Sequence, residues 1–151
     1  MDKLKVLFIC TQNRARSQMA EAFLRQFAGD SFEVESAGLE PADQVNPLVV
    51  EAMAEIGFDL SAKKPQSVFD LFKAGRIFDY VITVCDAEGE GRCPIFPGLT
   101  RRWHWPFPDP ASVTGTREER LEQVRAIRDQ IRKHVLLPFD EAFPPQDSLV
   151  R

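Results

Sequence analysis

The sequence has no long apolar run, no excess of basic residues and few cysteines, and each shortage excludes a class of protein. The apolar stretch at 4–9 is too short for a membrane span or for the core of a signal peptide. A formal net charge of -4 argues against nucleic acid and anionic membranes as partners, because both attract basic surfaces. We therefore expect a cytoplasmic protein that binds neither.

The three cysteines are an odd number and are widely spaced, so a static disulfide framework is not expected. Reactive thiols are the better interpretation. The cysteines show no ligand-pair spacing with the two histidines, His104 and His134, so the sequence indicates no zinc site and no other cofactor. The chain has 151 residues and no internal repeat, which suits one domain, and we expect a monomer.

Short apolar segments alternate with amphipathic ones along most of the chain. Strands are predicted at 4–9, 32–37, 80–84 and 100–105. Helices are predicted from Ser17, from Asn46 and Pro47, at 68–73 with the capping pair Ser67 and Asp70, and from Thr116, which forms a capping box with Glu119. This alternation predicts an α/β three-layer sandwich, with a central four-stranded parallel sheet flanked by helices. We expect residues 1–137 to form this domain and residues 138–151 to be a mobile tail with little to bury.

Four segments are expected to meet at one edge of the predicted sheet. Ligands of such sheets bind beyond the carboxyl ends of the strands. Cys10, Gly38, Cys85 and the loop around Asp109 all fall at this edge. The sequence therefore predicts a binding site there.

The loop at 10–17 joins a strand to a helix and has the residues of an anion site. Its backbone N–H groups can form a nest at a helix N-terminus, where Arg16 grips two oxygens. The same field favours the thiolate of Cys10, and Ser17 can donate a hydrogen bond to the sulfur. Asn13 tolerates the left-handed backbone of a tight cradle. The predicted oxyanion-binding residues are Thr11, Gln12, Asn13, Arg14, Ala15 and Arg16.

Each candidate also has a plainer interpretation when it is taken alone. A cysteine that ends an apolar strand, such as Cys10 or Cys85, is often an inert core residue. Cys93 can be an incidental surface thiol, and Asp109, which precedes a proline, can be a turn residue. The combination of cysteine, nest and arginine in one loop favours the functional interpretation of Cys10.

The segment CTQNRARSQMAE resembles the active-site loop of the low-molecular-weight tyrosine phosphatase superfamily. Six further segments resemble the arsenate reductases that are regenerated by thioredoxin or a similar thiol system. They are SQMAEAF, VESAG, NPLVVEAMAEIGFDLS, DYVITVCD, RCPIFPG and FPDPAS. The resemblance covers nearly all of residues 3–135.

This resemblance implies a function and a role for each candidate. Cys10 would attack arsenate, Cys85 would then attack Cys10 and release arsenite, and Cys93 would move the disulfide outward to a reductant. Asp109 would be the general acid that protonates the leaving oxygen. The implied catalytic residues are Cys10, Arg16, Ser17, Cys85, Cys93 and Asp109, with arsenate or a phosphate-like oxyanion as substrate.

The chain departs from this family at several positions. Gln12, Arg14 and Ala15 differ from the residues that many relatives carry, and Arg14 can strengthen anion capture or alter selectivity. Some relatives bind a potassium ion at residues matching Asn13, Glu21 and Ser36. The further aspartate expected there is replaced around Gln66 or Ser67, so the sequence does not support this metal site fully.

Two other functions stay open from the sequence. Hydrolysis of phosphomonoesters such as phosphotyrosine needs only Cys10, Arg16 and Asp109. The aromatic residue that usually follows the acid in such phosphatases is absent, since Ala111 and Ser112 stand there. A non-enzymatic anion sensor is the other alternative, and it would leave the thiol of Cys10 unreactive.

Overall fold

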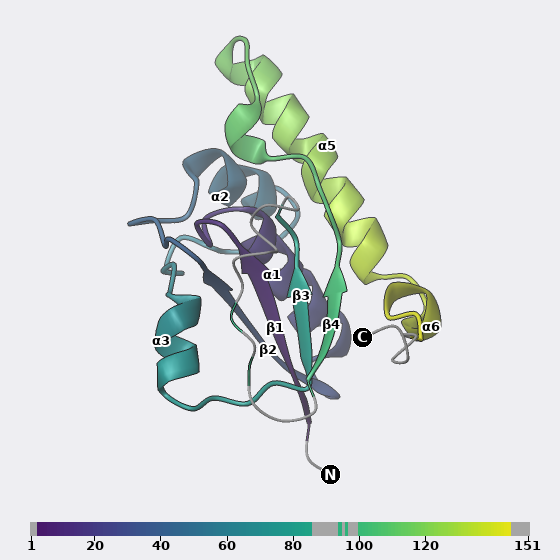
Figure 1. Cartoon of the computed structure of the whole chain (residues 1–151). Helices are drawn as coiled ribbons and strands as arrows, with labels where there is room; N and C mark the ends of the chain where they lie inside the picture. Colours follow the sequence, from purple (N-terminus) through teal and green to yellow (C-terminus); the bar gives the residue numbers. More distant parts are fainter. Residues whose placement is uncertain (1–2, 86–93, 95, 97–99, 146–151) are drawn as a thin grey trace.

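A computed structural model describes residues 3–85, 94, 96 and 100–145, and shows one parallel sheet with helices on both faces (Figure 1). The strand order is β2-β1-β3-β4. The strands are β1 (Leu4–Cys10), β2 (Phe32–Gly38), β3 (Tyr80–Thr83) and β4 (Arg101–His104). The helices are α1 (Arg16–Ala28), α2 (Pro47–Ala54), α3 (Val68–Lys73), α5 (Arg117–Val135) and α6 (Phe139–Ala142), with a 3-10 helix, η1 (Pro110–Ser112). The predicted α/β fold class is confirmed.

Alternate residues of β1 enter different cores, because successive side chains of a strand point to opposite faces of the sheet. Val6, Phe8 and Cys10 pack in the larger core, which includes apolar residues of α1, α2 and α5. Leu7 and Ile9 pack in the smaller core, with residues of α3. The strand is therefore buried on both faces, and its alternation places Cys10 on the side of α1.

The predicted helix starts are found where the sequence places them. The side chain of Ser67 accepts hydrogen bonds from the backbone of α3, and Asn46 caps α2 by accepting from the N–H of Leu48. Thr116 and Glu119 form the expected capping box of α5. These local rules are reliable here because each cap satisfies backbone N–H groups that have no partner within the helix.

The carboxyl ends of the strands meet at one edge of the sheet. Strand β1 lies between β2 and β3, so the chain leaves β1 toward one neighbour and later returns on the other side. Cys10 is paired with Gly38, and the N–H of Val84 donates to the carbonyl of Ile9 (2.8 Å). This edge is a topological switch point, where α/β sheets bind their ligands.

The expectation that the chain beyond residue 137 has little to bury does not hold at Ala142 and Phe143, which are buried. The side chain of Phe143 is buried, and its ring lies 5.2 Å from Trp103 and 5.3 Å from Tyr80, measured between centroids. The indole N–H of Trp103 also donates to the carbonyl of Pro144 (3.0 Å). The prolines and polar ends of this segment give no sign in the sequence that Phe143 packs against aromatic residues of β3 and β4. The remainder of the predicted tail, residues 146–151, lies outside the described residues.

Within the part of the chain that the structure describes, no helix combines the length and the apolar character needed to cross a membrane.

Candidate active site

The loop at 10–17, here called the Cys10 loop, is held in place by hydrogen bonds that its backbone carbonyl groups accept. Four of its carbonyls accept hydrogen bonds from the backbone of residues 39–46. The pairs are Leu39 N to Cys10 O (3.2 Å), Glu40 N to Thr11 O (2.7 Å), Ala42 N to Gln12 O (3.0 Å) and Asn46 N to Arg14 O (2.8 Å). No peptide of the described residues is cis, and in a trans peptide the C=O and the following N–H point in opposite directions. The N–H groups that follow these carbonyls therefore point to the inner side of the loop.

Asn13 helps to fix the conformation of the Cys10 loop through both its backbone and its side chain. Its φ of 51° lies in the left-handed region, as the sequence predicted for this residue. The buried side chain donates from Nδ2 to Ser17 Oγ (2.8 Å), while Oδ1 accepts from the backbone of Gln66 (2.9 Å) and from Gln18 Nε2 (3.2 Å). A side chain at Gly38 would not fit beside it, because a Cβ there would lie 2.7 Å from Asn13 N.

The sulfur of Cys10 has two hydrogen-bond partners from its own loop. The N–H of Asn13 donates to Sγ (3.1 Å), and Ser17 Oγ lies 2.9 Å from it. Since this hydroxyl oxygen already accepts from the Asn13 amide, its hydrogen is available for the sulfur. The predicted contact between Ser17 and Cys10 is confirmed. The sulfur therefore accepts hydrogen bonds from a backbone N–H and from a hydroxyl group of its own loop.

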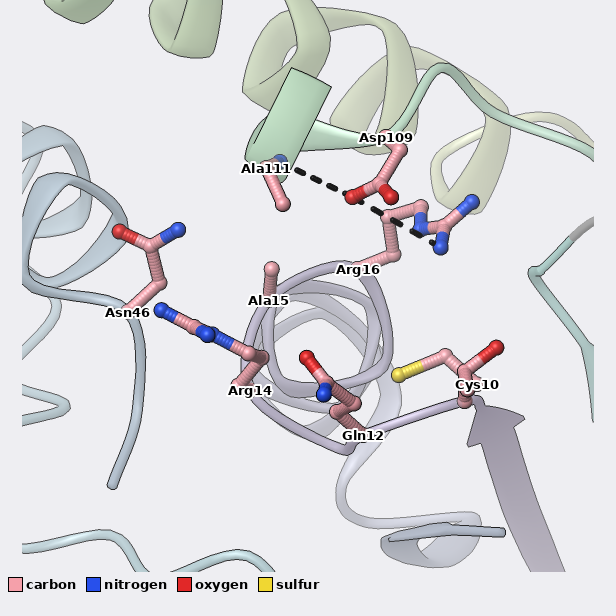
Figure 2. Close-up of a pocket in the computed structure, with 9 residues that line it drawn as sticks. Cys10, Gln12, Arg14, Ala15, Arg16, Asn46, Asp109 and Ala111 are labelled. Carbon is pink, nitrogen blue, oxygen red and sulfur yellow. Dashed lines mark hydrogen bonds and ion pairs between the residues drawn. The ribbon is translucent and has the colours of Figure 1, made fainter. Parts of the chain in front are cut away.

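A cavity of about 290 Å³ opens over the Cys10 loop (Figure 2). It is lined by Cys10, Thr11, Gln12, Arg14, Ala15, Arg16, Asn46, Asp109 and Ala111. The structure thus brings the predicted nucleophile, the predicted acid and most predicted oxyanion-binding residues together. Asn13 is fully buried and is not among the residues that line the cavity, but its N–H donates to the sulfur of Cys10, which does.

Arg16 and Asp109 meet at one side of this cavity. Arg16 is only 8% exposed and donates from NH1 to the carbonyl of Phe107 (3.1 Å), while its NH2 lies 3.8 Å from Asp109 Oδ1. Asp109 also accepts from the N–H of Ala111 (2.9 Å), which caps η1. The residues 105–113, here called the Asp109 loop, therefore carry a carboxyl group to the mouth of the Cys10 loop.

Only one of the two other cysteines lies in the described part of the chain. Cys85 is fully buried and follows β3, the strand beside β1, and it belongs to the same core cluster as Cys10. Cys93 lies outside the described residues. Its role stays a prediction from the sequence.

The residues of the candidate potassium site lie close together, but their oxygen atoms already have hydrogen-bond or ion-pair partners. The carboxylate of Glu21 accepts from Ser36 Oγ (2.6 Å), and its second oxygen lies 2.7 Å from both Lys63 Nζ and Arg25 NH2. The amide oxygen of Asn13 has its own donors, described above. Two side-chain cations already neutralise the buried carboxylate, so this arrangement does not fit a further cation.

Several residues at or near the site were not predicted from the sequence. Asn46 was recognised only as a helix cap, yet it lines the cavity, and the carbonyl of Phe107 that receives Arg16 leaves no signal in the sequence. His134 of α5 packs behind the Asp109 loop, with its ring centroid 4.3 Å from Trp105 and 5.8 Å from Phe107. Burial lowers the pKa of His134 from its ordinary 6.5, so its neutral form is favoured.

The model of the family described as low molecular weight phosphotyrosine protein phosphatase matches residues 5–137. The chain belongs to this family. Among the relatives of this chain, an arsenate reductase of Halalkalibacterium halodurans is 42% identical over 137 residues, which cover 89% of this chain and 94% of that protein.

Two solved structures of arsenate reductases have the same fold. An arsenate reductase in the phosphate binding state has a TM-score of 0.69 and 28% identity, and the match covers 87% of this chain and 93% of the other. A thioredoxin-dependent arsenate reductase of Corynebacterium glutamicum has a TM-score of 0.59 and 32% identity, covering 89% of this chain and 63% of the other.

Proposed function

We propose that this phosphatase-family protein reduces arsenate to arsenite, using Cys10 as the nucleophile and Cys85 and Cys93 as successive redox partners. The curated relatives at about 40% identity that are named arsenate reductase support this activity. The cavity over the Cys10 loop supports it independently, because inward N–H groups and Arg16 suit a tetrahedral oxyanion.

The observation that favours reduction over simple hydrolysis is the position of Cys85. Hydrolysis needs no second thiol, yet Cys85 is buried at the end of the strand next to that of Cys10, in the same core cluster. Burial keeps this thiol from reagents in solvent, so a partner for its reaction must come from within the protein, and Cys10 ends the neighbouring strand.

In the first step, the thiolate of Cys10 attacks arsenic(V) and forms a sulfur–arsenic bond while one arsenic–oxygen bond breaks. Arg16 and the inward N–H groups neutralise charge on the remaining oxygens. Asp109 donates the proton with which the departing oxygen leaves as water. Asn13 and Ser17 hold the sulfur in the attacking position through the hydrogen bonds described above.

In the second step, the thiolate of Cys85 attacks the sulfur of Cys10. A disulfide forms, the sulfur–arsenic bond breaks, and its electron pair stays on arsenic, which leaves as arsenite. The thiolate of Cys93 then attacks Cys85 and releases Cys10 as a thiolate. A dithiol reductant of the thioredoxin class returns two electrons to the Cys85–Cys93 disulfide, which places the cycle in the reducing cytosol.

Single-turnover chemistry without a reductant tests this sequence of steps. The reduced protein is mixed with arsenate, arsenite is counted and disulfides are mapped by mass spectrometry. Wild-type protein should release about one arsenite per chain and form the Cys85–Cys93 disulfide, and Cys93→Ser should release the same amount and stop at Cys10–Cys85. Cys85→Ser should release none. Arsenite formation by Cys85→Ser at the wild-type rate would refute the mechanism.

A second activity, hydrolysis of phosphomonoesters, is favoured by the family match and by the contact of Arg16 with Asp109 at one side of the cavity. It needs Cys10, Arg16 and Asp109 only. A variant that carries both Cys85→Ser and Cys93→Ser separates the two functions. If the protein is primarily a phosphatase, this variant keeps full turnover of an aryl phosphate, and the wild type makes arsenite no faster than the variant.

A further inference from the structure

Arg14 lies in the Cys10 loop but does not point to the sulfur. Figure 2 shows its side chain leaving the loop on the side away from Cys10, toward Asn46. It lines the cavity over the sulfur and also a second cavity of about 420 Å³. Arg14, Asn46 and Ala111 line both, so the two cavities adjoin, with Arg14 at their boundary.

The guanidinium of Arg14 has no anionic partner in the described part of the chain. No side-chain hydrogen bond or ion pair of Arg14 is formed with these residues, and its Nε is buried without an acceptor. A buried N–H without an acceptor costs about 1–3 kcal/mol, more when the group is charged. An oxygen atom of a bound ligand would supply the missing acceptor, and the cavity beside Arg14 has room for one.

The second cavity also has a second cation. It is lined by Arg14, Asn46, Pro47, Leu48, Pro110, Ala111, Val113 and Arg120. Arg120, on the first turn of α5, is exposed and forms no side-chain ion pair with the described residues, whereas Arg117, three residues before it, is paired with Glu51. The charged side chains among the lining residues are therefore two arginines and no carboxylate.

We propose that Arg14 and Arg120 form a second anion subsite, which binds a carboxylate or phosphoryl group of a ligand whose first anionic group lies over Cys10. The guanidinium groups supply planar N–H donors, which suit the paired oxygens of either group. Pro47, Leu48 and Val113 give the subsite an apolar wall, which suits a short carbon chain between the two anions. The preferred ligand is a small organic dianion rather than an inorganic oxyanion alone. The subsite rests on the proposed oxyanion-binding role of the Cys10 loop.

The test measures ligand binding without turnover, through protection of Cys10 against alkylation by iodoacetamide, read on the Cys10 peptide by mass spectrometry. Three probes share one phosphonate and differ in the second anion. Ethylphosphonate has none, 3-phosphonopropionate has a carboxylate, and propane-1,3-diphosphonate has a second phosphonate. Wild-type protein should bind one or both dianions about tenfold more tightly than ethylphosphonate, and the stronger of the two identifies the group that the subsite accepts.

Variants assign this preference to the two arginines. Arg14→Gln should reduce the ratio of dianion to ethylphosphonate affinity to about one, and Arg14→Lys should keep part of it, since the charge stays while the planar fork is lost. Arg120→Gln should reduce the ratio about threefold, because its side chain is exposed. Arg117→Gln is the matched control on the same helix and should leave the ratio unchanged.

The outcomes separate this inference from the proposed function. Equal protection by all three probes overturns the subsite and leaves the Cys10 loop as an oxyanion site. A dianion preference that persists in both Arg14→Gln and Arg120→Gln also overturns it. Protection by none of the probes overturns both the subsite and the oxyanion role of the loop. A preference that depends on Arg14 supports the subsite even if the protein forms no arsenite from arsenate.

Discussion

The Cys10 loop and the Asp109 loop face each other across one cavity, but they are held in different ways. In the Cys10 loop, Asn13 and Ser17 are fully buried, and the carbonyls are bound by the backbone of residues 39–46. In the Asp109 loop, the carboxyl side chain is 46% exposed and is held by the N–H of Ala111 and a longer contact to Arg16.

This difference matches the demands of the proposed chemistry. An oxyanion cradle acts by donors that are already in place when charge develops, so its loop must be rigid before the substrate arrives. An acid that reaches over the substrate must let it enter and leave. Substitutions in the Cys10 loop should therefore change stability and activity together, whereas substitutions in the Asp109 loop should change activity alone.

Arg16→Lys should cause the largest loss of activity. Lysine keeps the positive charge, but the rigid Cys10 loop loses the paired N–H donors of the guanidinium group. We expect arsenite formation at saturating thioredoxin to fall about 10³-fold, as for the loss of a preorganised oxyanion donor. Arg132→Lys, the same exchange on α5 away from the cavity, is the control and should be unchanged. Loss of less than tenfold in Arg16→Lys would show that Arg16 is not a central donor.

Asn13→Ala should cost about 3 kcal/mol of unfolding free energy, because it deprives Gln66 N of its acceptor, removes one of the two acceptors of Gln18 Nε2 and keeps a residue with Cβ at positive φ. Asn13→Gly removes the same amide but permits this backbone, so it should be about 1 kcal/mol more stable than Asn13→Ala. Urea unfolding of the three proteins measures both differences. Equal stability of the two variants would mean that the left-handed backbone carries no strain.

Asp109→Asn should lower arsenite formation about 10²-fold without a change in stability, since the general acid is lost. The asparagine side chain can still accept from the N–H of Ala111 and cap η1, so the unfolding free energy should change by less than about 0.5 kcal/mol. The measurements are single-turnover kinetics and urea unfolding on the same preparation. A variant that is inactive and also clearly destabilised would contradict the independence of the two loops.

The smallest expected effect is a dependence of the unfolding free energy on pH that comes from His134. Burial lowers its pKa below 6.5 in the folded state, so unfolding takes up a proton in acid. The contribution of neutral His134 to the unfolding free energy is therefore fully present above about pH 6.5. It is lost as the pH falls toward the lower pKa of the folded state. His134→Phe keeps a ring against Trp105 and should lose less stability than wild type between about pH 8 and pH 5.5, by urea unfolding. Parallel losses in the two proteins would exclude His134 as the cause.

Local features of the site were predictable from the sequence. The apolar run before Cys10 predicted β1, Ser67 and Thr116 predicted their helix starts, and Asn13 predicted a left-handed residue. Each depends on a residue and its near neighbours in the chain, where backbone geometry and capping act.

Contacts between distant segments were not predictable in this way. The carbonyls of the Cys10 loop are bound by residues 39–46, Arg16 meets the carbonyl of Phe107, and Phe143 is buried among aromatic residues of other strands. No spacing rule encodes these pairs, because they depend on how the sheet, the helices and the loops pack.

The sequence by itself determined which chemical groups the protein can use and the order of its strands and helices, because side-chain chemistry and hydrophobic periodicity are local properties of the chain. The tertiary structure alone decided which of these groups share a cavity. It placed Asp109 beside Arg16 and Cys85 in the same core cluster as Cys10. It also placed Arg14 and Arg120 on the lining of one cavity. The physical reason is that such encounters depend on the burial of apolar faces by elements far apart in the chain.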